Sequence, residues 1–388
     1  MRRLWQVAVI IVFAAVASAS VANASGPNSC DSAFVKRDGH RITVLPNGHD
    51  DTANLQCALD MAVSLHNHAI VRLVTGDYYT AQVNVYGFEG RLSGDSMQTT
   101  VIHNVPWPIP VTPVDYFAAW PSAEWQWSGL LIFVGGRFTV SDLSLKISGF
   151  PVTTGTTFSF WDLEPFSELQ FGILATGNDT HARLVRVAVD AELAPLRSDD
   201  DPGASLYGTN VINAIMLGGL LNYEPISGSL IVKDSRTSKA GSGIILGSVH
   251  DASAVVSGNE VTSTSDGIDL WTGNGGIDYF VHGNQVTAPY ALLFMDWGDP
   301  QPPIFNSRIR IADNKLAGSV GIDMAGAAYA GTWTFGADVE CRMVNNDVDG
   351  VTGPGILLGP GTTGCVVVGT PADRIVDEGT DNVIIPKR

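Results

Sequence analysis

The sequence has little charge, and little of it is basic. Of 388 residues only 16% are charged, and 22 Lys and Arg face 39 Asp and Glu, which gives a formal net charge of −17. Such a chain lacks the positive surface that nucleic acids and anionic membranes require, so we expect neither as a partner. Because 45% of the residues are hydrophobic, the chain can still build a core, and intrinsic disorder is excluded.

Several sequence motifs of common active sites are also missing. There is no Cys-x-x-Cys, no His-x-x-x-His, no Gly-x-Ser-x-Gly and no phosphate-binding glycine loop. The sequence therefore gives no sign of a zinc or redox site, a hydrolase of the nucleophile-elbow type or a nucleotide-binding domain. Beyond the first residues, no apolar run approaches the length of a membrane span.

The N-terminus has the pattern of a secretory signal peptide. Arg2 and Arg3 precede an apolar stretch from Val7 to about Val16, and Ala22-Asn23-Ala24 offers a small-x-small cleavage site. The alternative, a transmembrane anchor, needs a run of about 20 residues. We predict a signal peptide over residues 1–24 and a secreted protein, extracellular or periplasmic. Cleavage leaves 20 basic and 39 acidic residues, a net charge of −19.

The four cysteines fit export into an oxidising compartment. Their number is even, so disulfides are expected, and four cysteines allow three pairings. Cys30 and Cys57 lie near one end of the chain, and Cys341 and Cys365 near the other. This distribution suggests the pairs Cys30–Cys57 and Cys341–Cys365.

Two short patterns recur along the chain, and from Gly243 onward their intervals are 24 to 34 residues. A Gly-Ile-x-Leu-like pattern recurs, and a Gly-Asn-x-Val-like pattern recurs out of phase with it. The copies of the first begin at Gly172, Gly243, Gly267, Gly321 and Gly355, with looser copies at Ala214 and Ala291. The second carries Asn259, Asn284, Asn314 and Asn346. Each unit has room for short strands but not for a helix of about 10 residues, so leucine-rich repeats and alternating β-α units are excluded.

Repeated units of this kind bury their apolar faces by stacking on one another. A solenoid whose strands pair in parallel, about 4.8 Å apart, satisfies this need. The recurring asparagines would then stack as an internal ladder, whereas in the alternative interpretation Gly-Asn merely marks hairpin turns. Before the repeats, Asp50-Asp51-Thr52 can cap an amphipathic helix that covers the open end of the solenoid; its apolar positions are Leu55, Ala58, Leu59, Ala62 and Val63.

The segments that follow this helix carry a resemblance to a known family. Residues 71–79 (Val-Arg-Leu-Val-Thr-Gly-Asp-Tyr-Tyr), 87–95 (Gly-Phe-Glu-Gly-Arg-Leu-Ser-Gly-Asp) and 99–102 (Thr-Thr-Val-Ile) resemble the N-terminal part of right-handed parallel β-helix proteins of the pectate-lyase-like superfamily. The resemblance covers Asp50 to the C-terminus. It implies an all-β chain with a single right-handed parallel β-helix. The predicted organisation is a signal peptide (1–24), an N-terminal segment with a capping helix (25–70) and a β-helix with a C-terminal cap (71–388).

The third position of the Gly-Ile-x-Leu pattern places acidic residues on the outer face. If Ile and Leu point inward, x points to solvent, and this position holds Leu174, Met216, Ile245, Asp269, Leu293, Asp323 and Leu357. Further acids and two tryptophans lie along the same line of strands: Asp266, Asp296, Asp299, Trp271 and Trp297. Paired carboxyl groups can act as acid and base on a glycosidic bond, and rings stack on sugars. The alternative is that these aspartates are solvated and the tryptophans cover an apolar flank.

The family comparison assigns a role to one of these residues. Thr264-Ser265-Asp266-Gly267-Ile268-Asp269 resembles the Asn-Thr-Asp-Gly-Ile-Asp segment of polygalacturonase-type hydrolases, which implies a catalytic Asp266. The paired Asp-Asp, the Gly-His-Gly and the Arg-Ile-Lys of that family have no clean match. Fragments remain in His282-Gly283 and in Arg308-Ile309-Arg310, so Arg308 and Arg310 are candidate substrate contacts.

Two loops and the charge complete the functional hypothesis. The aromatic stretch 106–127 either walls a glycan cleft or packs on the solenoid, and Ser198–Pro202 is either a calcium site or a solvated acidic turn. We predict a secreted carbohydrate-active enzyme that hydrolyses or transfers glycosidic bonds with Asp266, Asp269, Asp296 and Asp323, with Trp271, Trp297, Asp299, Arg308 and Arg310 binding substrate. No cofactor is expected, calcium apart. The alternatives are a calcium-assisted polysaccharide lyase or epimerase and a glycan-binding protein without activity.

Overall fold

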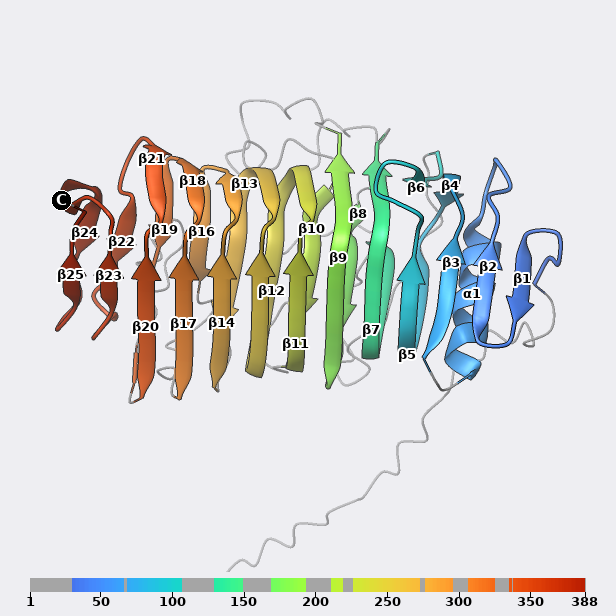
Figure 1. Cartoon of the computed structure of the whole chain (residues 1–388), viewed down its shortest axis with the longest axis horizontal. Coiled ribbons are helices and arrows are strands. Elements are labelled where there is room, and N and C mark those ends of the chain that lie inside the picture. Colours follow the sequence, from blue (N-terminus) through green and yellow to red (C-terminus); the bar gives the residue numbers. More distant parts are fainter. Residues whose placement is uncertain are drawn as a thin grey trace, which may run out of the picture.

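The chain forms a long stack of short parallel strands, seen side-on in Figure 1. The structure, a computed structural model, describes residues 30–65, 68–106, 129–148, 169–192, 211–218, 226–272, 276–295, 306–324, 335–336 and 338–387. Within these ranges there are 25 strands, one α-helix and one short 3-10 helix over Ala372–Arg374. The fold is the predicted right-handed parallel β-helix, with α1 near one end and β25 at the other.

The strands form three rows, and each coil adds to a row by pairing in parallel with the coil before it. The first row comprises β2 (Arg41–Val44), β3 (Ala69–Leu73), β5 (Val83–Ser93), β7 (Gly129–Ile147), β9 (Thr180–Ala191), β11 (Ile226–Lys233), β12 (Arg236–Ser257), β14 (Ile277–His282), β17 (Ser307–Ala312), β20 (Val339–Val344), β23 (Val366–Val368) and β25 (Val383–Ile385). One antiparallel strand, β1 (Val35–Asp38), pairs with β2.

The second and third rows share the long strands β7, β12 and β13 (Glu260–Thr272), which bend from one row into another. The second row adds β4 (Gly76–Thr80), β6 (Thr100–Asn104), β15 (Gln285–Thr287), β18 (Lys315–Gly318) and β21 (Asp347–Val351). The third row adds β8 (Leu169–Thr176), β10 (Val211–Gly218), β16 (Tyr290–Met295), β19 (Val320–Asp323), β22 (Ile356–Leu358) and β24 (Ile375–Asp377).

The asparagine ladder exists as predicted. The Asn284 side-chain amide donates to the Val256 carbonyl oxygen at 2.9 Å and to Asn314 Oδ1 at 2.9 Å, and its own oxygen accepts from the Asn259 backbone N–H at 3.0 Å. Asn314 and Asn346 repeat the pattern. Ser235 extends the ladder, because its N–H donates to Asn259 Oδ1 at 2.9 Å. These bonds satisfy buried backbone groups at the turn between the first and second rows.

Helix α1 (Thr52–Ser64) covers the core at the end where the chain enters the solenoid. The predicted apolar positions Leu55, Ala58, Leu59 and Ala62 are buried, and Val63 is partly buried. The capping differs from expectation, because the carboxylate of the N-cap residue Asp51 accepts no capping hydrogen bond from the helix backbone. Its carboxylate instead accepts from the N–H groups of Asn47, at 2.9 Å, and Tyr79, at 3.2 Å, and so fixes the loop before the helix.

Both predicted disulfides are present. Cys30 is bonded to Cys57, which joins the N-terminal segment to α1, and Cys341 is bonded to Cys365, which joins two neighbouring coils. Paired cysteines are the state expected in an oxidising compartment. The predicted signal peptide (1–24), the aromatic stretch 107–127 and the acidic loop 198–202 lie outside the described residues. Within the described ranges, no helix is long and apolar enough to span a membrane.

Candidate functional site

The third strand row stacks the recurring pattern in the predicted register. Ile215 pairs with Ile244, Ile244 with Ile268, and Ile268 with Leu292, and their side chains belong to the interior core. The x position forms a neighbouring column in the predicted order: Leu174, Met216, Ile245, Asp269, Leu293, Asp323 and Leu357. The alternation of side chains between the two faces is therefore confirmed.

The expectation that this column points into solvent is wrong. Leu174, Met216, Ile245 and Leu293 are buried, and with Ile132 and Phe171 they form a second apolar cluster, separate from the interior core. Four apolar side chains in one column exclude water because their burial is favourable. Asp269 and Asp323 occupy the same column and are 1% and 0% exposed, so they are buried carboxyl groups rather than solvated ones.

Asp266 belongs to a second column on the same side of the row. Its register partners are Ser242 and Tyr290, and Ser242 in turn pairs with Asn213. The side chain is only 2% exposed. Its Oδ2 accepts from the Ser265 hydroxyl at 3.0 Å and from the Ser242 hydroxyl at 3.4 Å. Its Oδ1 has no hydrogen-bond partner, and neither has Oδ1 of Asp269.

Burial changes the proton affinity of both carboxyl groups. Desolvation raises the pKa of Asp266 from 3.8 to about 6, against the lowering effect of the Ser265 and Ser242 hydroxyls. Burial also raises the pKa of Asp269 well above its usual range, and the nearby negative charge of Asp266 adds to the effect. Both effects favour the protonated carboxyl form, and at Asp269 the negative charge of ionised Asp266 favours it further.

Tyr290 and Asp323 extend the group by one and two coils. Tyr290 is the partly exposed member, and its pKa is raised by burial and then by the negative charges of Asp323 and Asp266. This places the phenol within electrostatic reach of both carboxyl groups. Asp323 is two strand spacings from Asp269, which corresponds to about 9.6 Å between their backbones. We name Asp266, Asp269, Tyr290 and Asp323 the carboxyl cluster.

The other predicted site residues do not join this cluster. Asp296, Trp297 and Asp299 lie outside the described residues, and for Trp271 only the backbone, in β13, is described. Arg308 and Arg310 lie on β17 in the first strand row, where Arg308 pairs with Asp278 and Arg310 with Glu340 at 3.0 Å. The structure thus brings together Asp266, Asp269 and Asp323, and it places the two arginines on a different row.

Three polar members of this site are not among the residues predicted from the sequence. Ser242 and Tyr290 occupy the position of Asp266 in adjacent repeats, directly before Gly243 and Ala291, and Ser265 precedes Asp266. Aligning the repeats predicts the x column, and the same alignment also places Ser242, Asp266 and Tyr290 in one column.

The carboxyl cluster has the composition of an acid–base site. Two neighbouring carboxyl groups, in which the charge of one raises the pKa of the other, can donate and accept protons in a single reaction. A metal is not needed for such chemistry, and no group of three or more His, Cys, Asp or Glu side chains in the described part of the chain is arranged to hold one. Buried polar atoms without partners call for a functional explanation, and two of them occur here.

Comparisons with known proteins address the fold alone. No family model matches the sequence, and no curated protein matches it either. Among solved structures, the Dettilon tailspike protein (gp208) is 11% identical, with a TM-score of 0.40, over 88% of this chain and 68% of that one. The A-module of the Azotobacter vinelandii mannuronan C-5 epimerase AlgE4 is 14% identical, with a TM-score of 0.30, over 87% and 94%.

The A-module of the epimerase AlgE6 from the same organism is 12% identical, with a TM-score of 0.24, over 88% of this chain and 97% of that one. Similarities this low carry no argument about activity. The fold rests instead on the chain's own strand pairing, coil on coil in parallel. By that architecture the chain is a right-handed parallel β-helix protein.

Proposed function

We propose that the chain is a carbohydrate-active enzyme whose acid–base groups are Asp266 and Asp269, with Asp323 and Tyr290 completing the site. The observation that carries the proposal is the pair of buried carboxyl groups that each keep one oxygen without a partner. Such groups cost stability unless a ligand or reaction uses them. Fold alone does not assign the chemistry, because one fold hosts many reactions.

The raised pKa values of the two carboxyl groups support hydrolysis or transfer of a glycosidic bond. Asp269, with its raised pKa, can protonate the leaving oxygen, while ionised Asp266 accepts a proton or stabilises positive charge at the sugar carbon. Asp323, two coils away, is the candidate for a second carboxylate at the spacing that leaves room for a water molecule. Asp296, Trp271, Trp297 and Asp299 stay predicted members of the same site.

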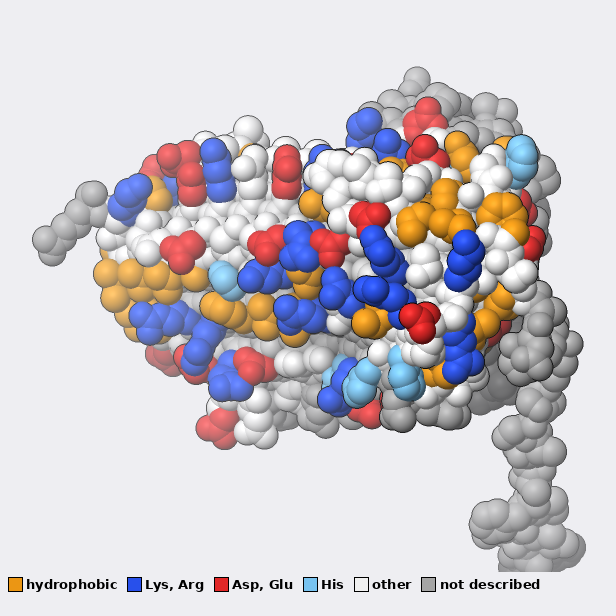
Figure 2. All heavy atoms as spheres, turned by 45° about the vertical axis from the view of Figure 1, so that its right-hand side comes forward, with side chains coloured by type: hydrophobic (Ala, Val, Ile, Leu, Met, Phe, Trp, Pro, Cys, Tyr) orange, Lys and Arg blue, Asp and Glu red, His pale blue; other side chains and the backbone are white. Residues whose placement is uncertain are grey.

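Charge favours a neutral glycan over a polyuronate. The net charge of −17 repels polyanions in solution. On the face shown in Figure 2, basic and acidic side chains are interspersed, so that face offers no single-sign basic surface for a polyanion. The two disulfides agree with an exported protein that meets its glycan outside the cytoplasm.

The test is a screen of the purified protein against neutral and acidic polysaccharides, read by new reducing ends and by ultraviolet absorbance. Hydrolysis gives reducing ends only, a lyase gives unsaturated ends that absorb, and an epimerase changes the uronate composition without cleavage. We expect Asp269→Asn to lower turnover by at least about 100-fold, because it removes the proton donor. The matched control is Asp347→Asn, an exposed carboxyl group on the second strand row, which should keep full activity.

Saturable binding without product on every polysaccharide would favour the alternative of a glycan-binding protein. This alternative is favoured by the near-complete burial of Asp269 and Asp323, because carboxyl groups with a purely structural role would also be closed to solvent. Wild-type turnover in both Asp269→Asn and Asp323→Asn would contradict the site assignment, whatever the reaction.

A further inference from the structure

We propose that a groove on the second strand row is a second, non-catalytic binding site for a short neutral oligosaccharide. The groove has a volume of about 470 Å³, within the range of small-ligand sites. It lies over β7, β9 and β12, whereas the carboxyl cluster lies on the third row, over β13, β16 and β19. That the ligand is a glycan rests on the proposed function, but the groove itself does not.

Short side chains create the hollow. The outward positions of neighbouring coils are Val101, Ser144, Ala188, Arg236 and Glu260, which stack in this order by strand pairing. Ser144 and Ala188 are buried and small, so the groove has a low floor between larger neighbours. This floor is a property of two successive coils, since the next coils carry Arg236 and Glu260 at the same position.

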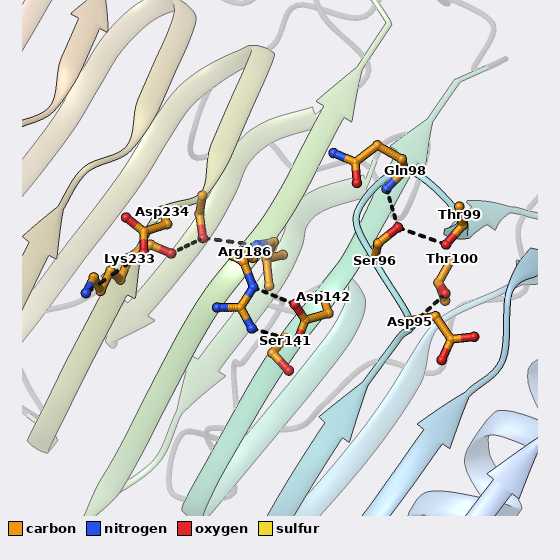
Figure 3. A network of polar contacts seen from close by, with 12 residues as sticks. Asp95, Ser96, Gln98, Thr99, Thr100, Ser141, Asp142, Arg186, Lys233 and Asp234 are labelled. Carbon is orange, nitrogen blue, oxygen red and sulfur yellow. Dashed lines mark hydrogen bonds and ion pairs between the residues drawn. The ribbon is translucent and has the colours of Figure 1, made fainter.

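One end of the groove is closed by the connection between β5 and β6. This connection brings Met97 and Gln98 to the groove, and the Ser144 hydroxyl donates to the Met97 carbonyl oxygen. Figure 3 shows Gln98 on this connection, Asp234 three coils further along the stack, and between them the Asp142–Arg186 pair, joined at 2.6 Å and 3.0 Å. The pair fixes two coils at the edge of the groove.

The side chains around the groove match a ligand rich in hydroxyl groups. Arg236 is held by Asp190 at 2.9 Å, and Asp190 also accepts from the Ser238 hydroxyl at 2.6 Å, so this wall is pre-oriented. Within the described part of the chain, the side chains of Lys146, Gln98 and Glu260 make no hydrogen bond or ion pair. The lining thus offers hydrogen-bond donors and acceptors beside a partly apolar floor. A sugar hydroxyl can satisfy both kinds, because it donates and accepts.

Charge selects a neutral ligand. The lining holds three carboxylates, Asp190, Asp234 and Glu260, and two cations, Lys146 and Arg236. Asp190 is paired with Arg236 at 2.9 Å and Asp234 lies 3.9 Å from Lys233, which leaves, among the described residues, Glu260 and Lys146 as charges of opposite sign. Neither sign dominates the lining, so a charged ligand gains little, while a neutral saccharide can bond each group in turn.

The probes are four neutral trisaccharides: maltotriose, cellotriose, mannotriose and triacetylchitotriose. Binding to the full chain is measured by calorimetry and by saturation-transfer NMR. We expect at least one of them to bind with a Kd of about 1 mM or tighter, and Lys146→Ala to weaken that binding by about tenfold, the effect of one lost charge-assisted hydrogen bond. Ala188→Trp fills the floor and should abolish binding. Lys315→Ala, an exposed lysine on the same row outside the groove, should leave the Kd unchanged.

The outcomes separate this proposal from the catalytic one. Loss of binding in Lys146→Ala and Ala188→Trp, with normal binding in Asp269→Asn, supports the groove even if no polysaccharide is ever turned over. Binding that is lost in Asp269→Asn and kept in Lys146→Ala assigns the saccharide to the carboxyl cluster and overturns the groove. Absence of binding by all four trisaccharides, or equal binding in all variants, overturns it as well.

Discussion

Replacing Asp266 by asparagine should make the protein's stability respond differently to pH. In the folded chain the pKa of Asp266 is about 6, against 3.8 for an unperturbed aspartate, because burial disfavours the carboxylate. The unfolded chain therefore loses this proton at a lower pH than the folded chain does. An amide has no proton to lose in this range, so Asp266→Asn removes the effect while keeping the size of the side chain.

The sign and magnitude follow from proton linkage. Below about pH 4 the carboxyl group is protonated in both states and its contribution to stability is fully present. As pH rises from about 4 to 6 the folded state holds more protons than the unfolded state, so stability falls, and above about pH 6 it levels off. A shift of about 2 pKa units corresponds to about 3 kcal/mol. Between pH 3.5 and 7.5, Asp266→Asn should therefore gain about 3 kcal/mol relative to the wild type.

The assay is denaturant unfolding of both proteins at several pH values, with disulfides intact. The quantity compared is the difference between their free energies of unfolding, in which contributions of titrating groups outside the carboxyl cluster cancel to first order. Ser265→Ala provides a second test, because loss of its hydrogen bond raises the pKa of Asp266 further and extends the window to higher pH. A difference that is flat across the range, or that turns against the variant as pH rises, would refute the burial argument.

Three further predictions concern the frame of the solenoid. Asn284→Ala leaves several buried partners unbonded and should cost at least about 3 kcal/mol in denaturant unfolding, whereas the exposed neighbour variant Gln285→Ala should stay within about 0.5 kcal/mol. Gly267→Ala places a Cβ 2.5 Å from a backbone oxygen of the next coil, so it should cost about 3 kcal/mol and disturb the carboxyl cluster in the same step. Removing the Cys341–Cys365 bond with serines should cost about 3 kcal/mol and lower the thermal midpoint, and an unchanged midpoint would contradict this.

The repeated patterns predict most of the fold, for a physical reason. A residue that stacks on its own copy must satisfy the same contacts in every coil, so its type recurs in the sequence at the coil spacing. Asn259, Asn284 and Asn314 recur because each amide bonds the next. The columns of the third row could be read in the same way, and their register agreed with the pairing.

Burial of the outer column could not be read from alternation alone. Alternation tells which face a side chain occupies, but whether that face meets water depends on what packs over it. The chemical signal was nevertheless present, since Leu174, Met216, Ile245 and Leu293 are all apolar at a position assigned to solvent. An outward column of this composition predicts a covered face. The positions of Arg308 and Arg310 were missed differently, because a fragment of a motif does not say which strand row carries it.

Two aspartates on the same solenoid show how environment separates structural from chemical roles. Asp278 lies on the first strand row, exposed to solvent and paired with Arg308, an arrangement that adds little stability. Asp269 lies in a column of apolar side chains beside Asp266, and its Oδ1 makes no hydrogen bond within the described part of the chain. The register neighbours of Asp269 are Ile245 and Leu293. A leucine at this position would fit the column without the free-energy cost of burying a carboxyl group. A polar group that persists where the fold would favour an apolar one is best explained by a reaction or ligand that requires it, and this is the reason to test Asp269 first.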